Sequence, residues 1–164
     1  MSKQVRAASL VAMAALLLTG CTPSANPQPT PSYTPKVYVN APLTGMPFEE
    51  GTRPSLNGPS VACKIDNVGT ENLKANINRA DMVYVELVEG GLTRLVAVWH
   101  SDLPTAVGPV RSIRPMDPDI ISPLGGIVCY SGGQLKFVTM MRNTNVFNAS
   151  ETSEQSNGTF SRAK

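Results

Sequence analysis

The chain has 164 residues, with 14 Lys and Arg, 12 Asp and Glu and one His, and a formal net charge of +2. This balance lacks the basic surplus that nucleic-acid binding requires, so we expect no nucleic-acid partner. Three Cys, one His and no C-x-x-C spacing provide too few ligands for a typical zinc site. We therefore expect no metal and no cofactor.

The first 20 residues follow the order of a secretory signal peptide. Lys3 and Arg6 precede an apolar segment at 7–18, which ends in the small residues Thr19 and Gly20. A bilayer-spanning helix needs about 20 apolar residues, and this segment is shorter. We therefore expect a signal peptide at 1–20 that is cleaved directly before residue 21.

The segment LLLTGC, which ends at Cys21, resembles the lipobox of bacterial lipoproteins. In those proteins the cysteine thiol receives a diacylglycerol and becomes the new N-terminus. The resemblance implies that Cys21 is lipidated, with acyl chains such as palmitate; the alternative is an ordinary signal peptide with an incidental cysteine. Because one acyl chain binds a membrane only marginally, several chains would be needed to hold the protein at the extracytoplasmic face of the cell membrane.

Residues 21–41 form the predicted linker between the anchor and a domain at 42–164. Its segment 22–35, TPSANPQPTPSYTP, is rich in Pro, Ser and Thr and cannot form an apolar core. In polyproline-like geometry, at about 3.1 Å per residue, it would span roughly 40 Å. We expect the signal and the linker to be disordered and the domain to stand clear of the membrane.

Two short apolar segments predict buried strands. Val61–Ile65 and Ile127–Tyr130 are rich in β-branched residues, and they contain Cys63 and Cys129 respectively. An extracytoplasmic location permits a disulfide between these cysteines. A buried free Cys would instead pack as a small apolar side chain, so both alternatives stay open.

The region after residue 115 predicts two helical segments. Met116–Pro123 is typical of a short helix or turn, and Leu135, Val138 and Met141 recur at the spacing of an amphipathic helix. The turn Ser131–Gly133 precedes that helix. Such a turn is able to bind an anion through backbone N–H groups, although a simple turn and cap is the commoner role.

The segment 81–100, DMVYVELVEGGLTRLVAVWH, predicts a β-hairpin. Gly90 and Gly91 tolerate the positive φ angles of a two-residue turn. With that turn, Glu89 and Arg94 are diagonal neighbours on one face of the hairpin. Both faces are largely apolar, so we expect the hairpin to lie at the centre of its sheet, covered on both sides.

Glu86 and Glu89 suggest different roles. Glu86 lies among apolar side chains, where a carboxylate must be paired or must change its pKa. The two could form a glycosidase pair only if a bulge intervened, because residues three apart on a straight strand point to opposite faces. We expect Glu89 and Arg94 to form a structural ion pair at the turn, and Glu86 remains the candidate catalytic residue.

The segment 107–119, VGPVRSIRPMDPD, contains Arg111 and Arg114 on either side of Ser112. The guanidinium group suits carboxylates and phosphates because it can donate two parallel hydrogen bonds. These three residues are therefore the candidate ligand-binding site for an anionic group of the cell wall. In the alternative interpretation both arginines pair within the protein, with one of three carboxylates: Asp117, Asp119 or Glu86.

Four segments resemble the N-terminal domain of the YerB-like bacterial lipoproteins, a family of unknown function. They are PLTG at 42–45, VACKIDN at 61–67, ADMVYVELVEGGLTR at 80–94 and VGPVRSIRP at 107–115. The most specific elements are VEGG-x-TR and GPVRS-x-R. The resemblance implies an α/β fold, in the form of an α+β layered sandwich, and a surface lipoprotein with no established activity.

The family pattern can be carried over by position. It includes Asp66, Asn67, Asp81, Glu86, Glu89, Gly90, Gly91, Thr93, Arg94, Gly108, Pro109, Arg111, Ser112, Arg114, Ser131, Gly132 and Gly133. Family members continue past a segment like Thr159–Arg162 into further strands and a second domain. We therefore expect the domain at 42–164 to be incomplete at its C-terminal end.

Two functions remain open. In the first, the protein is a non-catalytic cell-envelope module that binds a wall polymer or an envelope protein through Arg111, Ser112 and Arg114. In the second, it is an enzyme acting on envelope glycan, with Glu86 as the catalytic carboxylate and the two arginines orienting the substrate. The sequence contains no nucleophile, metal or cofactor motif, so we favour the first.

Overall fold

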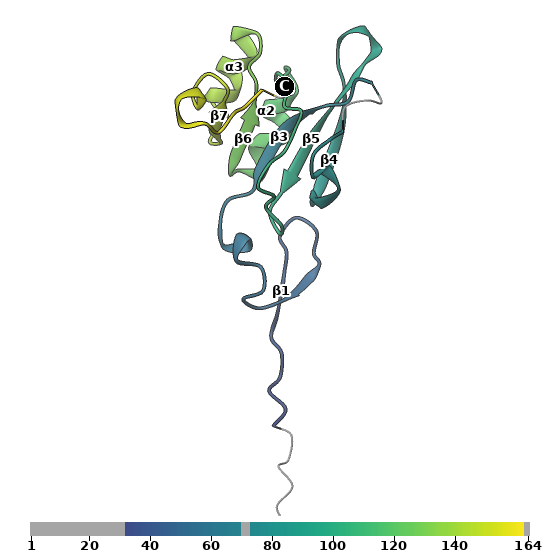
Figure 1. Cartoon of the computed structure of the whole chain (residues 1–164), viewed down its shortest axis with the longest axis vertical. Coiled ribbons are helices and arrows are strands. Elements are labelled where there is room, and N and C mark those ends of the chain that lie inside the picture. Colours follow the sequence, from purple (N-terminus) through teal and green to yellow (C-terminus); the bar gives the residue numbers. More distant parts are fainter. Residues whose placement is uncertain (1–31, 70–72, 163–164) are drawn as a thin grey trace, which may run out of the picture. The chain divides into compact units, whose positions relative to one another are not determined.

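A five-stranded mixed sheet organises the structure (Figure 1). Its strands, in chain order, are β3 (Val61–Asp66), β4 (Met82–Leu87), β5 (Thr93–Trp99), β6 (Ile127–Tyr130) and β7 (Phe147–Ser150). Across the sheet the order is β4-β5-β3-β6-β7. The pairs β4–β5 and β5–β3 are antiparallel, and the pairs β3–β6 and β6–β7 are parallel. This mixed α/β arrangement confirms the predicted fold class.

The computed structural model describes residues 32–69 and 73–162. The predicted signal peptide and residues 21–31 of the predicted linker, Cys21 included, lie outside the described residues. Lys36–Lys164 form one compact unit, and the described residues 32–35 belong to another. The described part of that other unit, residues 32–35, contains no helix or strand. Residues 36–41 of the predicted linker belong to the compact unit and include a strand at Tyr38–Asn40, so the domain starts earlier than the predicted residue 42.

A two-stranded antiparallel sheet precedes the main one, made by β1 (Tyr38–Asn40) and β2 (Pro47–Glu49). Short 3-10 helices connect the other elements. They are η1 (Pro54–Asn57), η2 (Ile77–Arg79), η3 (Glu89–Gly91), η4 (Ser122–Leu124) and η5 (Gln155–Asn157).

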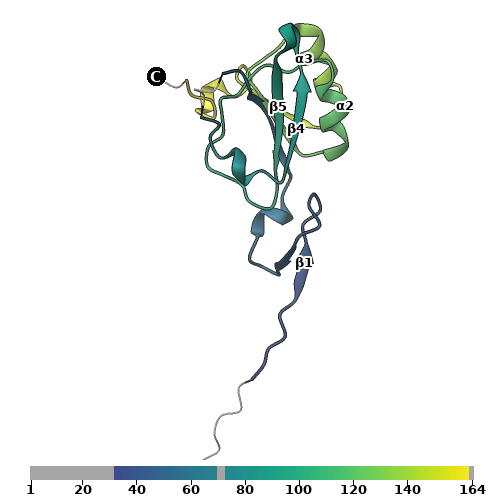
Figure 2. The ribbon, with the colours of Figure 1, turned by 90° about the vertical axis from the view of Figure 1, so that its right-hand side faces the viewer.

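Two α-helices cover one face of the main sheet, as Figure 2 shows: α2 (Asp117–Ile121) and α3 (Leu135–Arg142). Helix α2 begins with an Asp-Pro pair, and its first turn carries two acidic residues, both favourable at a helix N-terminus. Phe137 and Met141, four residues apart, form the buried stripe of α3. The expected helix is confirmed, but its expected buried residue Leu135 is 79% exposed.

The sheet separates two apolar clusters. On the helix-covered face, the buried residues include Ala62, Val96, Val98, Val128 and Tyr130 from the strands. The opposite face buries Cys63, Ile65, Leu95, Ala97 and Trp99 against loop residues such as Ile77 and Val110. The indole N–H of Trp99 donates to the carbonyl of Asn76 at 3.2 Å, so Trp99 is a core residue, as expected.

The hairpin turn is one residue longer than predicted, and this changes the register. The turn consists of Glu89–Gly91, and the N–H of Val88 donates to the carbonyl of Leu92 at 2.8 Å. Glu86 therefore lies directly opposite Arg94. Because opposite residues share a face, the predicted diagonal relation between Glu89 and Arg94 is wrong: Arg94 shares the helix-covered face with Glu86.

The hairpin also lies at the side of the sheet instead of at its centre. Strand β5 is interior, but β4 is an edge strand. Its side chains on the face away from the helices, Val83, Val85 and Leu87, are 45%, 67% and 68% exposed. The expectation of cover on both sides is therefore wrong for β4, because the loops that cover the neighbouring strands on this face do not reach these three residues.

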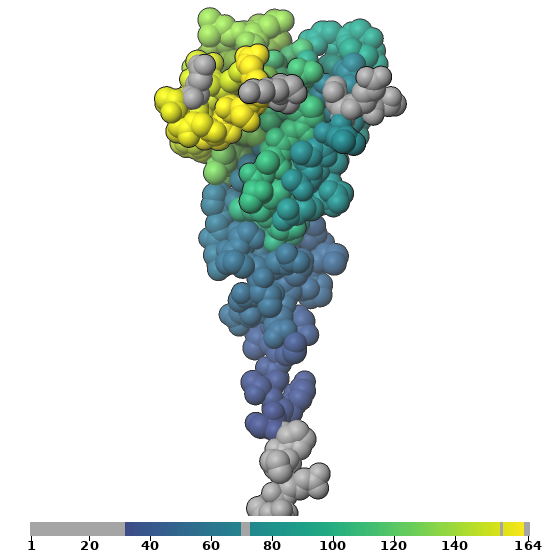
Figure 3. All heavy atoms as spheres, in the orientation of Figure 1, coloured from purple at the N-terminus to yellow at the C-terminus, as the bar shows by residue number. Residues whose placement is uncertain are grey.

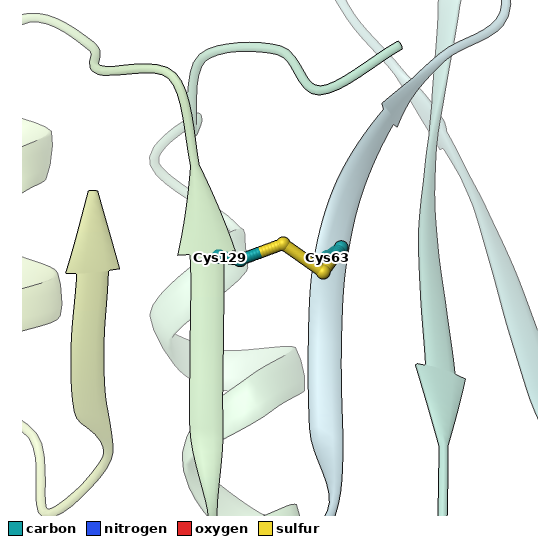
Figure 4. Close-up of a disulfide and its surroundings, with 2 residues drawn as sticks. All are labelled: Cys63 and Cys129. Atoms are coloured by element: carbon teal, nitrogen blue, oxygen red, sulfur yellow. A yellow bond between two sulfur atoms is a disulfide. The ribbon is translucent and has the colours of Figure 1, made fainter. Parts of the chain in front are cut away.

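A disulfide joins Cys63 in β3 to Cys129 in β6 (Figure 4). The two residues are direct partners in the parallel register, with their Cα atoms 4.5 Å apart. One of the two alternatives that the sequence left open is thus realised. The bridge closes a sequence separation of 66 residues and includes both strands of the hairpin within its loop.

Strand β7, with the sequence FNAS, was not expected from the sequence. It follows α3 and pairs in parallel with β6, which makes a β-α-β unit of β6, α3 and β7. Figure 3 shows the segment after β7, in yellow, on the side of the main sheet away from the β4–β5 hairpin. The parallel strands β3, β6 and β7 end at the same edge of the sheet, and the arginine segment is hydrogen-bonded to the ends of the first two.

Candidate anion-binding site

The arginine segment is built into the sheet between the ends of β3 and β6. The N–H of Asp66 donates to the carbonyl of Pro109 at 2.9 Å, and the N–H of Arg111 donates to the carbonyl of Lys64 at 2.8 Å. On its other side, the N–H of Ser131 donates to the carbonyl of Arg111 at 3.1 Å. The backbone of this segment is therefore held by both strands at the edge where α/β sheets commonly bind ligands.

Gly133 allows this close approach. A Cβ atom at this position would lie 3.0 Å from Cγ1 and 3.3 Å from the carbonyl oxygen of Ile113, and the residue has a φ of +157°. The N–H of Ile113 donates to the carbonyl of Gly132 at 2.9 Å. The Ser131–Gly133 turn, considered as an anion site, therefore also serves to hold the arginine segment.

Arg111 and Arg114 both form ion pairs within the protein. Nη2 of Arg111 lies 2.9 Å from Oδ2 of Asp66, and the Arg111 side chain is 49% exposed. Nε of Arg114 lies 2.8 Å from Oε2 of Glu89. Burial alone would raise the pKa of Asp66, but hydrogen bonds from Arg111 and from the Val68 N–H lower it below its usual range.

The internal partners differ from those expected from the sequence. Among the three expected carboxylates, Asp117 accepts a hydrogen bond from the backbone N–H of Arg114 and not from its guanidinium group. The expected Glu89–Arg94 ion pair is wrong as well, because Glu89 pairs with Arg114. The reason is the longer turn, which moves Arg94 to the other face of the hairpin.

Arg94 joins the other two arginines through the backbone of Ser112. Its Nη1 donates to the Ser112 carbonyl at 2.8 Å, while its Nε is buried without a hydrogen-bond partner. Burial lowers the pKa of the Arg94 guanidinium group, and the neighbouring cation Arg114 lowers it further. The structure therefore places three arginines around Ser112, where the sequence had suggested two.

Glu86 belongs to a buried charge cluster with Lys64 and Asp117. Nζ of Lys64 donates to Oε2 of Glu86, and it lies 2.8 Å from Oδ1 of Asp117. All three side chains are at most 4% exposed. Burial raises the pKa of Glu86 to about 7; the hydrogen bond from Lys64 opposes this rise and the charge of Asp117 adds to it. With Glu86 protonated, one ammonium group and one carboxylate balance each other.

The surroundings of Glu86 do not resemble an open active site. Its Oε1 is buried without a hydrogen-bond partner, and Glu89, the second carboxylate of the considered glycosidase pair, is bound to Arg114. A surface depression of about 210 Å³ lies between η1 and the loop 101–103, and neither Glu86, Arg111 nor Ser131 lines it. Within the described residues, no group of three or more His, Cys, Asp or Glu is arranged to hold a metal ion.

Other residues of the family pattern support the chain locally. Asp81 accepts hydrogen bonds from the backbone N–H groups of His100, at 2.6 Å, and Ser101, at 2.8 Å, and thereby holds the end of β5. Nδ2 of Asn67 donates to Oγ1 of Thr93 at 2.7 Å, which links β3 to the start of β5. These contacts are structural.

Sequence reasoning missed Lys64. Its signal was a cation in the middle of the apolar segment VACKID, at a position that alternation assigns to a buried face. Its partner Asp117 is 53 residues further along the chain. That separation explains why the buried cluster was not apparent before the strands and α2 were placed together.

The family model described as "Protein of unknown function (DUF3048) N-terminal domain" matches residues 43–164. The chain belongs to this family. Over 76 residues, it is 37% identical to "Putative lipoprotein YerB" of Bacillus subtilis (strain 168). These aligned residues make up 46% of this chain and 22% of that protein. The resemblance to YerB-like lipoproteins is therefore confirmed.

The fold is also similar to a solved member of the family. The crystal structure of the YerB protein from Bacillus subtilis matches with a TM-score of 0.62 and 25% identity. The match covers 70% of this chain and 39% of the solved chain. The chain thus spans well under half the length of these relatives. In the part of the chain that the structure describes, no helix is long and apolar enough to cross a membrane.

Proposed function

We propose that the protein is a lipid-anchored, non-catalytic module of the cell envelope. The anchor is the lipid on Cys21, after cleavage of the signal peptide at 1–20. The part of the predicted 21–41 linker that precedes the compact unit at Lys36 carries the domain at the extracytoplasmic face of the membrane. The LLLTGC segment and the similarity to "Putative lipoprotein YerB" support this anchor. The Cys63–Cys129 disulfide supports an oxidising compartment.

The binding site that we propose consists of Arg111, Ser112 and Arg114. The observation that carries it is the hydrogen bond from the Arg94 guanidinium group to the carbonyl of Ser112, which lies between Arg111 and Arg114 in the chain, at the carboxyl ends of the parallel strands β3 and β6. Each guanidinium group has five N–H donors, so these ion pairs leave donors for a ligand. The ligand is an oxyanion, supplied by the phosphates or the carboxylates of a cell-wall polymer or by an envelope protein.

The alternative, an envelope-glycan enzyme using Glu86, receives less support. A pKa near 7 suits a general acid or base. Glu86 is nevertheless only 5% exposed, and Lys64 occupies one of its oxygens. A substrate would have to open the buried cluster to reach the remaining oxygen, Oε1, so we assign Glu86 to the stability of the fold.

The test is co-sedimentation of the full chain, purified in detergent, with peptidoglycan. One sample of peptidoglycan retains its covalently attached phosphate polymers, and a second sample is stripped of them. The wild type is compared with the double variant Arg111→Ala, Arg114→Ala and with the matched control Arg162→Ala. Arg162 is suitable because its side chain is 89% exposed in an ion pair with Glu151, after β7.

We expect the double variant to lose retention while Arg162→Ala keeps it, with equal thermal unfolding for all three proteins. Binding to unstripped peptidoglycan alone would identify phosphates as the source of the oxyanion, and equal binding to both samples would identify carboxylates. Equal retention of wild type and double variant on both samples, or no retention of either, would overturn the proposed wall-binding function.

A further inference from the structure

Arg94 is the least compensated charge of the arginine cluster. Asp66 pairs with Arg111 and Glu89 pairs with Arg114, whereas no carboxylate of the described residues lies within salt-bridge distance of Arg94. Among the described residues, these three arginines and their two paired carboxylates carry one net positive charge. Burying a guanidinium N–H without an acceptor is costly, and the Nε of Arg94 is in that state.

Glu89 is the most easily displaced member of the cluster. It lies in the three-residue hairpin turn, its side chain is 64% exposed, and its side-chain ion pair is with Arg114. The following Gly90 and Gly91 both have positive φ, at +70° and +72°, which their lack of a Cβ atom permits. An exposed ion pair contributes little to stability, so a competing oxyanion is able to replace the Glu89 carboxylate on Arg114.

We propose that Arg94 is a third ligand-binding arginine of this site and that Glu89 is an internal competitor that occupies it in the free protein. An incoming phosphate or carboxylate group takes the place of the Glu89 carboxylate on Arg114 and accepts a hydrogen bond from Arg94. Asp66 keeps Arg111 in position at the end of β3. This inference rests on the proposed function, because it concerns the same arginine segment.

Two substitutions separate the two claims. Glu89→Gln removes the competing charge and keeps the size of the side chain, and its exposed position leaves the fold intact. Arg94→Lys keeps the positive charge but removes the Nε donor and the planar fork. Glu50→Gln, which changes an exposed carboxylate after β2, is the matched control for Glu89→Gln.

The experiment is titration calorimetry of the full chain in detergent, at constant ionic strength, with inorganic phosphate as one probe and acetate as the other. We expect Glu89→Gln to tighten binding of the preferred probe by about two- to fivefold, the range typical of an exposed ion pair. We expect Arg94→Lys to weaken binding by roughly tenfold or more, because the variant loses a charge-assisted hydrogen bond to the probe. Glu50→Gln should bind as the wild type does.

The outcomes distinguish the inference from the proposed function. If the Arg111→Ala, Arg114→Ala variant loses binding while Glu89→Gln and Arg94→Lys bind like the wild type, the site stands and the role of Arg94 and Glu89 is refuted. If the wild type and the double variant bind both probes equally, or neither binds, the arginine site itself is refuted. Tighter binding by Glu89→Gln together with weaker binding by Arg94→Lys supports the inference.

Discussion

At the scale of single residues, the buried cluster of Lys64, Glu86 and Asp117 is the most unusual feature of the chain. Two carboxylates and one ammonium group lie together on the helix-covered face of the sheet. A single lysine cannot neutralise two buried carboxylates, so retaining a proton on Glu86 removes the cost of one excess charge. The charge state of this cluster should therefore be visible in the stability of the fold.

We predict that the free energy of unfolding decreases as the pH rises from about 4.5 to about 7. Burial raises the pKa of Glu86 from 4.5 to about 7, so in this window the unfolded chain releases a proton that the folded chain keeps. The free energy of unfolding falls by about 3 kcal/mol at most, and it stops falling above pH 7. Asp66 and Glu89 have lowered pKa values, so their effect on the free energy of unfolding falls at lower pH than that of Glu86.

The measurement is urea unfolding of wild type and Glu86→Gln at several pH values between 4 and 8. The variant lacks the titrating group, so the difference between the two proteins isolates Glu86. We expect the variant to gain stability relative to the wild type as the pH rises. Parallel curves over the whole range would show that the pKa of Glu86 is the same in the folded and the unfolded chain.

At the scale of elements, the hairpin shows what the sequence could and could not predict. The β-rich segments and the Gly-Gly signal correctly predicted both strands and the position of the turn to within one residue. The register depended on a single extra turn residue, and that residue reversed which β5 side chains share a face with β4. Apolar residues on both faces of β5 and β4 gave no alternation that would have fixed the register.

Other elements were predicted to different degrees, for physical reasons. Strands β3 and β6 and helix α3 were expected. Each of them buries side chains, and burial requires the apolar residues that form a visible pattern in the sequence. Strand β7, FNAS, carries only two buried residues at its end, so its sequence has little β signal. The edge position of β4 was not predictable, since an apolar edge strand has the same sequence pattern as a covered one.

The edge position of β4 can be tested through two valines of the hairpin. Val96 is fully buried in β5 on the helix-covered face, whereas Val85 in β4 is 67% exposed. We predict that Val96→Ala destabilises the protein by about 2 kcal/mol, from lost burial and a cavity. Val85→Ala should stay within about 0.5 kcal/mol. Equal costs in chemical denaturation would contradict the edge position of β4.

The disulfide joins β3 and β6 close to the place where the arginine segment lies between the ends of these two strands. Directly beyond Cys63 and Cys129, the backbone of Arg111 is hydrogen-bonded to both strands. We predict that the Cys63→Ala, Cys129→Ala variant loses about 2–5 kcal/mol of unfolding free energy. Wild type that has been unfolded, reduced and refolded with its thiols blocked should lose a similar amount. Unchanged stability in both samples would exclude a structural bridge.

At the scale of the whole molecule, the proposed function joins a membrane anchor to a ligand-binding domain. The sequence alone was enough to identify the family and the charged segment, and it predicts a lipidation signal. It could not identify the arginine cluster, because Arg94 reaches the segment only after the strands have paired. The positions of Asp66 and Glu89 as its counter-charges likewise depend on tertiary structure.

The anchor makes a prediction in living cells. When the full chain is expressed in a bacterium, we expect the wild type in the detergent-soluble membrane fraction and labelled by a fatty-acid probe. Cys21→Ala should lose the label, because no other residue of the LLLTGC segment carries a thiol. The Cys63→Ala, Cys129→Ala variant is the control and should remain labelled. Label on Cys21→Ala would contradict lipidation at this position.

The most direct test of the central claim is the retention of the full chain on peptidoglycan with and without Arg111→Ala, Arg114→Ala. We predict that the double variant loses retention by about tenfold or more, as expected when two charge-assisted contacts are removed, while Arg162→Ala is retained like the wild type. Equal retention of the folded double variant would contradict the claim and assign both arginines to structural ion pairs with Asp66 and Glu89.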